Sequence, residues 1–135
     1  MKQRIREFLS FLPPYILTML TVLLILWLTL SPRPFGSLST PFFPGADKLA
    51  HAVMFGFLVA MAALDRSRKE NYRPLSPRYL LSAALLTAMF GISIEYLQEA
   101  LHTGRSFEYA DMIADSAGAF CAALLWMLIQ LKTEG

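Results

Sequence analysis

The sequence predicts an all-α integral membrane protein, a bundle of four transmembrane helices with both termini in the cytoplasm. Of its 135 residues, 56% are hydrophobic, and the mean hydropathy of +0.47 is too high for an ordinary soluble domain. Apolar stretches of near-spanning length occur four times, where about 20 residues are needed to cross a bilayer. Basic residues gather in alternate links between these stretches, as membrane topology requires.

We expect a single transmembrane domain over residues 1–135, with helices at about residues 11–30, 47–64, 79–98 and 110–131. In the first helix, Pro13 and Pro14 fit the opening turn, where no intrahelical hydrogen bond is lost. The second helix reaches spanning length if it begins at Asp47 or just before it. The third and fourth stretches are long enough without such an extension.

Lysine and arginine counts set the orientation of the bundle. Nine of these residues lie in the N-terminal tail, the link after the second helix and the C-terminal tail. Only Arg33, Lys48 and Arg105 lie on the opposite side. Because cytoplasmic links carry the excess of positive charge, we expect the links at Gly36–Ala46 and His102–Tyr109 outside the cell.

Ionisable side chains gather at the predicted outer ends of the last three helices. An Asp at the centre of a spanning helix costs roughly 2.5–3.5 kcal/mol, so such residues indicate a functional site by default. Spacings of three or four residues put the paired groups of each helix on one face. Charges at the inner ends are interpreted as loop and anchoring residues. The predicted outward-facing ligand-binding pocket is formed by Asp47, Lys48, His51, Glu95, Gln98, Arg105, Asp111 and Asp115.

Four short motifs in this region resemble those of the VanZ-like membrane proteins. They are Asp47-Lys48-x-x-His51, Glu95-x-x-Gln98, Gly104-Arg105-Ser106-Phe107-Glu108 and Asp111-x-x-x-Asp115-x-x-Gly118. The resemblance covers about residues 45–131 and implies a role in the cell envelope. The family is named for a protein associated with resistance to the glycopeptide teicoplanin, and its activity is generally undefined. The usual family pattern has Asn where this chain has Asp115, which adds an acid to the cluster.

Three classes of function are consistent with these residues. In the favoured one, the pocket recognises or modifies an anionic lipid-linked envelope component, with Lys48 and Arg105 contacting its headgroup. In the second, the protein is a membrane hydrolase or transferase in which His51, Glu95, Asp111 and Asp115 are the catalytic candidates or bind a divalent metal. In the third, the polar cluster only fixes helix packing.

The sequence excludes some partners and leaves others open. A net charge of +2 gives no basic field for nucleic acid, so the expected partners are the bilayer and an anionic lipid or lipid-linked precursor. No metal motif of recognised spacing is present, and the sequence therefore assigns no metal site and no cofactor. It leaves both enzymatic status and oligomeric state undetermined.

Overall fold

The computed structural model of the chain describes residues 1–32, 43–102, 104 and 106–135. In these residues it contains α-helices and no strand, which confirms the all-α class. The helices are α1 (Lys2–Ser10), α2 (Ile16–Leu30), α3 (Ala46–Lys69), α4 (Pro77–Ala100) and α5 (Tyr109–Glu134). Helices α3, α4 and α5 are long and apolar enough to cross a membrane, whereas α2 is a shorter apolar helix of 15 residues.

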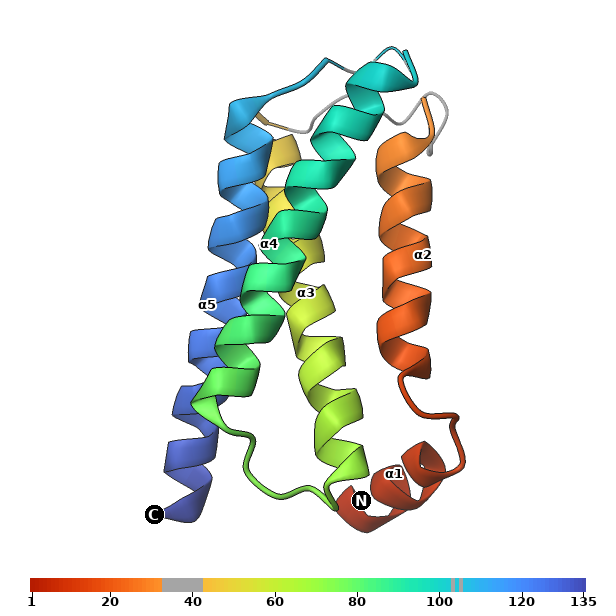
Figure 1. Cartoon of the computed structure of the whole chain (residues 1–135). Helices are drawn as coiled ribbons and strands as arrows, with labels where there is room; N and C mark the ends of the chain where they lie inside the picture. The colour runs from red at the N-terminus through yellow and green to blue at the C-terminus, as the bar shows by residue number, and fades with distance from the viewer. Residues whose placement is uncertain (33–42, 103, 105) are drawn as a thin grey trace.

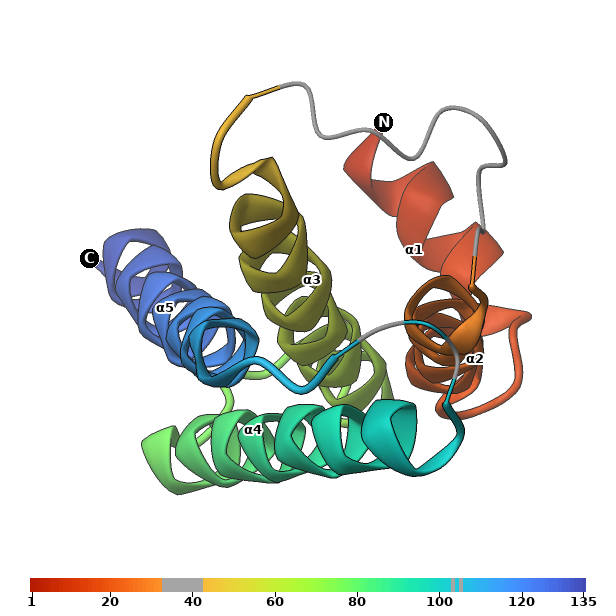
Figure 2. The same cartoon turned by 90° about the horizontal axis from the view of Figure 1, so that it is seen from above.

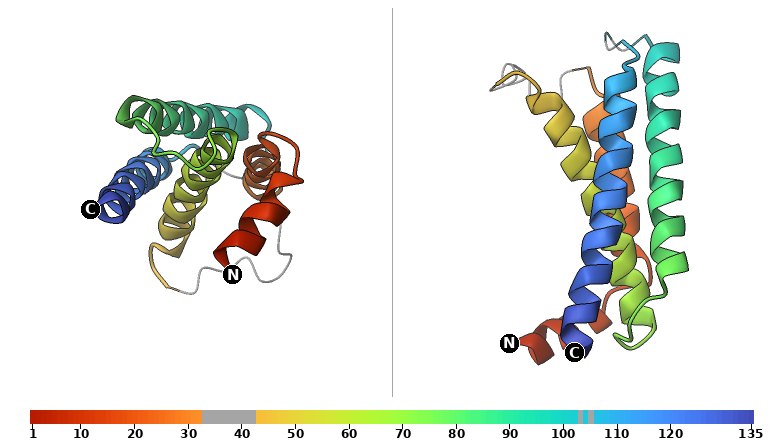
Figure 3. Two further views of the ribbon diagram at one scale, coloured as in Figure 1. Left: turned by 90° about the horizontal axis from the view of Figure 1, so that it is seen from below. Right: turned by 90° about the vertical axis from the view of Figure 1, so that its left-hand side faces the viewer.

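Helices α2 to α5 run side by side, and α1 lies across one end of the bundle (Figure 1). Both chain termini lie at that same end, as the side view in Figure 3 also shows. Helices α3 and α4 each contact the other three helices of the bundle. Viewed from above, α3 lies between α2 and α5, with α4 alongside (Figure 2). The end opposite the termini therefore brings together the start of α3, the end of α4 and the start of α5.

The N-terminal region differs from the expected single helix at residues 11–30. The structure has two helices here, because the chain breaks at Pro13 and Pro14 and α2 begins only at Ile16. A proline disfavours helical geometry in the residue before it, and its ring clashes with the carbonyl four residues earlier. Tyr15 then adopts a left-handed conformation with φ 60°, which turns the chain into α2. The expectation that both prolines fit the first turn of a helix is wrong.

A buried polar cluster joins the residues on either side of this break to α3, at the end of the bundle that carries the termini. Both oxygens of Asp65 accept hydrogen bonds, one from the backbone and hydroxyl of Thr18 at 2.8 Å each and one from Arg68 at 2.6 Å. Arg68 also donates to the carbonyls of Leu9 and Leu12. The interpretation of this end's charges as only loop and anchoring residues is wrong for Asp65 and Arg68, which lie on α3 and bond to α2 and to the chain before it.

Small side chains fill much of the bundle interior, and large apolar ones cover its surface. Fully buried alanines occur on α3, α4 and α5. The outward faces carry exposed leucines on every one of these helices and on α2. An apolar exterior of this extent is unsuited to water and suits lipid, and small interior residues are typical of helix packing in membranes.

The closest packing occurs between α3 and α5 at Gly118. A Cβ added there would lie 2.0 Å from the backbone oxygen of Ala52, a separation that real side chains do not tolerate. Gly56 repeats the pattern one turn later on α3, where an added Cβ would lie 3.0 Å from the oxygen of Gly118. The absence of side chains at these two positions lets the backbones of α3 and α5 approach directly.

We predict that Gly118→Ala destabilises the protein by about 1–3 kcal/mol or more, because the new methyl group meets backbone and not a movable side chain. Thermal unfolding in detergent measures the effect. Ala117→Ser adds one atom at the neighbouring exposed position and should unfold as the wild type does. Equal stability of Gly118→Ala and wild type would contradict the close α3–α5 contact.

Candidate functional site

The predicted site residues come together at the bundle end opposite the termini. The first turns of α3 supply three of them, the last turns of α4 supply two, and the first turns of α5 supply the remaining two. Arg105 lies outside the residues that the structure describes. The seven that it does describe are Asp47, Lys48, His51, Glu95, Gln98, Asp111 and Asp115.

His51 and Asp115 form the most buried hydrogen-bonded pair of side chains in the site. Nδ1 of His51 lies 2.8 Å from Oδ1 of Asp115, and their side chains are only 7% and 1% exposed. Because an ionised carboxylate only accepts, Nδ1 carries the hydrogen. In the neutral imidazole the lone pair is then on Nε2, which faces Oδ2 of Asp111 at 3.7 Å. The close α3–α5 contact at Gly118, one turn from Asp115, makes this pairing possible.

Gly91 on α4 provides the space for Asp115. A Cβ added at Gly91 would lie 2.7 Å from Oδ2 of Asp115 and 3.0 Å from the ring of Phe55. The Phe55 ring in turn lies parallel to the His51 imidazole, with centroids 6.4 Å apart. The carboxylate of Asp115 is therefore held between three helices, with apolar packing directly below the polar site.

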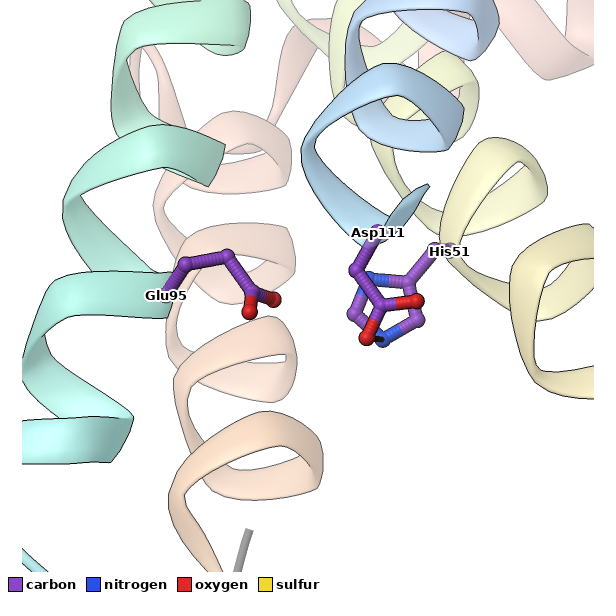
Figure 4. A group of neighbouring side chains, drawn as sticks. All are labelled: His51, Glu95 and Asp111. Atoms are coloured by element: carbon purple, nitrogen blue, oxygen red, sulfur yellow. Dashed lines mark ion pairs between the residues drawn. The ribbon is translucent and has the colours of Figure 1, made fainter. Parts of the chain in front are cut away.

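Glu95 is completely buried and points into the cluster. Its Oε2 accepts a hydrogen bond from the backbone N–H of Glu108 at 3.0 Å. Its Oε1 has no hydrogen-bond partner among the described residues, and the same is true of Oδ2 of Asp115. Figure 4 shows the Glu95 carboxylate directed from α4 toward Asp111 and His51. A buried polar atom without a partner is costly, so these two oxygens require an explanation.

Lys48 is surrounded by carboxylates at the rim of the site. Its ammonium lies 2.6 Å from Asp47 and 2.6 Å from Asp111, and it also bonds to Glu108. Lys48 therefore forms a salt bridge with Asp111, whereas the described residues show no such pair between Lys48 and Glu95. The ammonium already has three anionic partners.

Gln98 and Glu108 complete the site in different ways. The Gln98 amide donates to the backbone oxygen of Thr29 at 2.6 Å and so ties α4 to the end of α2. Glu108 precedes α5 and was not predicted as a site residue, although it ends one of the motifs quoted above. Its contacts with both Lys48 and Glu95 depend on the fold of the link before α5, which helix periodicity does not describe.

A pocket of about 280 Å³ opens above these residues. Its lining is predominantly polar and combines side chains of α3, α4 and α5 with the link between α4 and α5. It is formed by Asp47, His51, Gln98, Gly104, Ser106, Glu108 and Asp111. The geometry thus allows a small polar group to enter from the bundle end and reach His51 and Asp111, with Glu95 behind them.

We predict that Asp115→Asn preserves the fold, because the amide oxygen can still accept from His51 and one buried charge is removed. Asp115→Ala should cost about 1–3 kcal/mol, since it leaves the buried His51 N–H without its acceptor. Thermal unfolding of the two variants in the same detergent tests this. An Asn variant as unstable as the Ala variant would contradict the assigned hydrogen bond.

Comparison with known proteins agrees with the motifs noted in the sequence. The profile of the VanZ/LLP1 family matches residues 5–130 of the chain. Neither curated proteins nor solved structures gave a significant match. The match includes all of the helices that form the site and nearly the whole length of the chain. The chain belongs to the VanZ/LLP1 family.

Proposed function

We propose that this VanZ-family protein spans the cell membrane and binds, at its extracytoplasmic face, the headgroup of an anionic lipid-linked component of the cell envelope. One observation carries the proposal. Carboxylates and a histidine are buried together at one end of an otherwise apolar bundle, where they adjoin a polar pocket. Intramembrane ionisable residues that face a bundle interior are typical of substrate sites.

The distribution of charge supports the orientation. The end of the bundle that holds the termini has the nine basic residues of the cytoplasmic count. Helix α1 lies across this end and combines Lys2, Arg4 and Arg6 with exposed Ile5 and Phe8. A short amphipathic helix of this composition suits the surface of an anionic cytoplasmic leaflet. Helix α2 crosses together with the Phe11–Tyr15 segment that precedes it, which gives four crossings.

The two polar clusters differ in which of their carboxylate oxygens have donors, and this difference argues against a role in packing alone. At the termini end, both oxygens of Asp65 have donors, and the buried atoms without a partner are Nε of Arg68 and the hydroxyl of Tyr72. At the other end, buried oxygens of Glu95 and Asp115 lack donors among the described residues. A cluster that served only to hold helices together would be more stable with fewer charges. Unused acceptors beside a pocket suit a ligand.

The surroundings of the pocket indicate an amphiphilic ligand. Its polar lining lies at the end of helices whose outer faces carry exposed Leu97, Tyr96 and Ile113. A molecule with a lipid tail can therefore keep its tail in the bilayer while its headgroup enters from the bundle end. The resemblance to a family named for a protein associated with teicoplanin resistance extends this proposal to susceptibility to that glycopeptide.

A second candidate function is acid/base catalysis on the same ligand. The observation that favours it is the 2.8 Å contact between Asp115 and Nδ1 of His51, which orients the ring and leaves Nε2 directed toward the pocket side. A histidine oriented by a buried carboxylate is a common general base in hydrolases and transferases. Turnover of the bound molecule distinguishes this candidate from binding alone.

The orientation predicts the accessibility of single cysteines. In a Cys121→Ala background, Ser106→Cys should react with a membrane-impermeant maleimide on intact cells. Arg73→Cys, in the link between α3 and α4, should react only after permeabilisation. Both positions are exposed, so accessibility reports sidedness and not burial. Labelling of Arg73→Cys on intact cells would reverse the proposed orientation.

The binding proposal predicts that Glu95→Gln and Asp111→Asn reduce retention of co-purified lipid-linked molecules about tenfold or more. Each substitution keeps the side-chain volume and removes one charge-assisted hydrogen bond from a donor group of the ligand to the carboxylate, worth about 1.5–3 kcal/mol. Native mass spectrometry of gently extracted protein measures retention, and growth on teicoplanin measures the phenotype. The matched control is Glu99→Gln, which removes the same charge from an exposed position on the same helix end.

Normal retention and an unchanged teicoplanin phenotype in both folded variants would refute the proposal. Loss of folding in both, detected by thermal unfolding, would instead favour the packing-only alternative. Retention in Glu99→Gln should equal that of the wild type.

A further inference from the structure

Three side chains at the base of the pocket are arranged as metal ligands. His51 on α3, Glu95 on α4 and Asp111 on α5 each present one ligand atom, and these atoms lie within 4.8 Å of one another. The three come from three different helices and converge on one point (Figure 4). Imidazole nitrogen and carboxylate oxygen are both ordinary ligands of divalent transition metals.

The hydrogen bond between His51 and Asp115 prepares the imidazole for such a role. Metal-ligating histidines almost always donate their other ring N–H to a carboxylate or carbonyl, which fixes the tautomer and orients the ring. Here Nδ1 donates to Asp115 at 2.8 Å, and the opposite nitrogen faces Asp111 at 3.7 Å. A lone pair and a carboxylate that face each other repel, and either a proton on Nε2 or a metal cation between the two groups removes this repulsion.

The unpartnered oxygen of Glu95 supports a cation at this point independently of the ligand geometry. Glu95 is 0% exposed and directs its carboxylate into the cluster, yet its Oε1 has no donor among the described residues. A buried, ionised carboxylate is costly unless it is paired or binds a metal. A cation between these three side chains would satisfy Glu95 and the Nε2 of His51 at once.

The count of charged side chains in the site also favours a bound cation. Five carboxyl groups of the described residues surround one lysine and one histidine, and the lysine already contacts three of them. Among the described residues, an anionic headgroup that entered this pocket would meet an excess of negative charge. The group of carboxyls comprises Asp47, Glu95, Glu108, Asp111 and Asp115.

We infer that His51, Glu95 and Asp111 bind a divalent transition-metal ion, of which Zn²⁺ and Mn²⁺ fit the mixed nitrogen and oxygen ligands. Asp115 is the positioning residue that holds His51. Three protein ligands leave an open coordination position, and that position faces the pocket because His51 and Asp111 both line it. An oxygen of an anionic headgroup can occupy it. This last step rests on the proposed function, whereas binding of the metal does not.

Isothermal titration of EDTA-treated, detergent-solubilised protein with ZnCl₂ and with MnCl₂ tests the site. Saturable binding of one ion per chain is expected. His51→Gln and Glu95→Gln should weaken it at least tenfold, while His102→Gln and Glu99→Gln should not change it. These controls remove the same two side chains from exposed positions near the same end of α4. Thermal unfolding without metal verifies that each variant is folded.

A direct spectroscopic measurement needs no variant. Pulsed electron paramagnetic resonance of the wild type loaded with Mn²⁺ should show coupling to one imidazole ¹⁴N. The inference is overturned if neither ion binds, if bound Mn²⁺ shows no nitrogen coupling, or if folded Glu95→Gln retains wild-type affinity. It is also overturned if Asp47→Asn weakens metal binding and Glu95→Gln does not. The ion would then lie among the exposed carboxylates around Lys48.

Lipid retention separates the metal from the proposed function. If the metal bridges to the headgroup, EDTA should release co-purified lipid-linked molecules from the wild type, and ZnCl₂ or MnCl₂ should restore their retention. Metal binding without any retained lipid would refute the proposed ligand and leave the metal site intact. If EDTA does not change lipid retention and the titration shows no metal binding, the metal site is refuted, whereas the proposed lipid-linked ligand is not.

Discussion

The site depends on the direct contact of two helix backbones, α3 and α5, at Gly118. With any side chain there, Ala52 and Gly118 could not approach as they do, since a Cβ would lie 2.0 Å from a backbone oxygen. His51 precedes Ala52 by one residue, and Asp115 precedes Gly118 by three. The same close approach therefore brings imidazole and carboxylate to 2.8 Å. In lipid there is no hydrophobic driving force between helices, so such close packing must itself stabilise the bundle.

The two ends of the bundle show how buried charge can serve different purposes. Asp65 and Arg68 satisfy the backbone groups left open where Pro13 and Pro14 break the chain. That cluster is structural, since the groups it bonds belong to the protein itself. The cluster at the opposite end has acceptors in excess of donors and adjoins a pocket. Excess acceptors are expected of a site that binds a cation or a hydrogen-bond donor.

The departure of this chain from the usual family pattern has a local consequence. Asp115 uses only one oxygen to hold His51, a task that the Asn of other family members could perform through its amide oxygen. The second oxygen lies beside Gly91 without a donor among the described residues. The additional acid thus raises the negative charge beside His51 without adding a hydrogen bond among the described residues, which favours the cation proposed for this site.

The sequence by itself determined the all-α class, the family, and the set of ionisable residues that share helix faces near the ends of α3, α4 and α5. It predicted four spanning helices, of which three have spanning length in the structure, whereas the first is the shorter helix α2. Helical spacing and hydropathy are local properties, so they can be read from the order of residues alone.

Only the tertiary structure decided how those faces meet: that His51 bonds to Asp115, that Lys48 is enclosed by carboxylates, and that Glu108 joins the site. It also decided that the chain breaks at Pro13 and Pro14 between two helices, and that Asp65 accepts hydrogen bonds from Thr18 just after this break. These outcomes depend on contacts between residues far apart in the chain, whose distances are set by helix packing and not by sequence spacing.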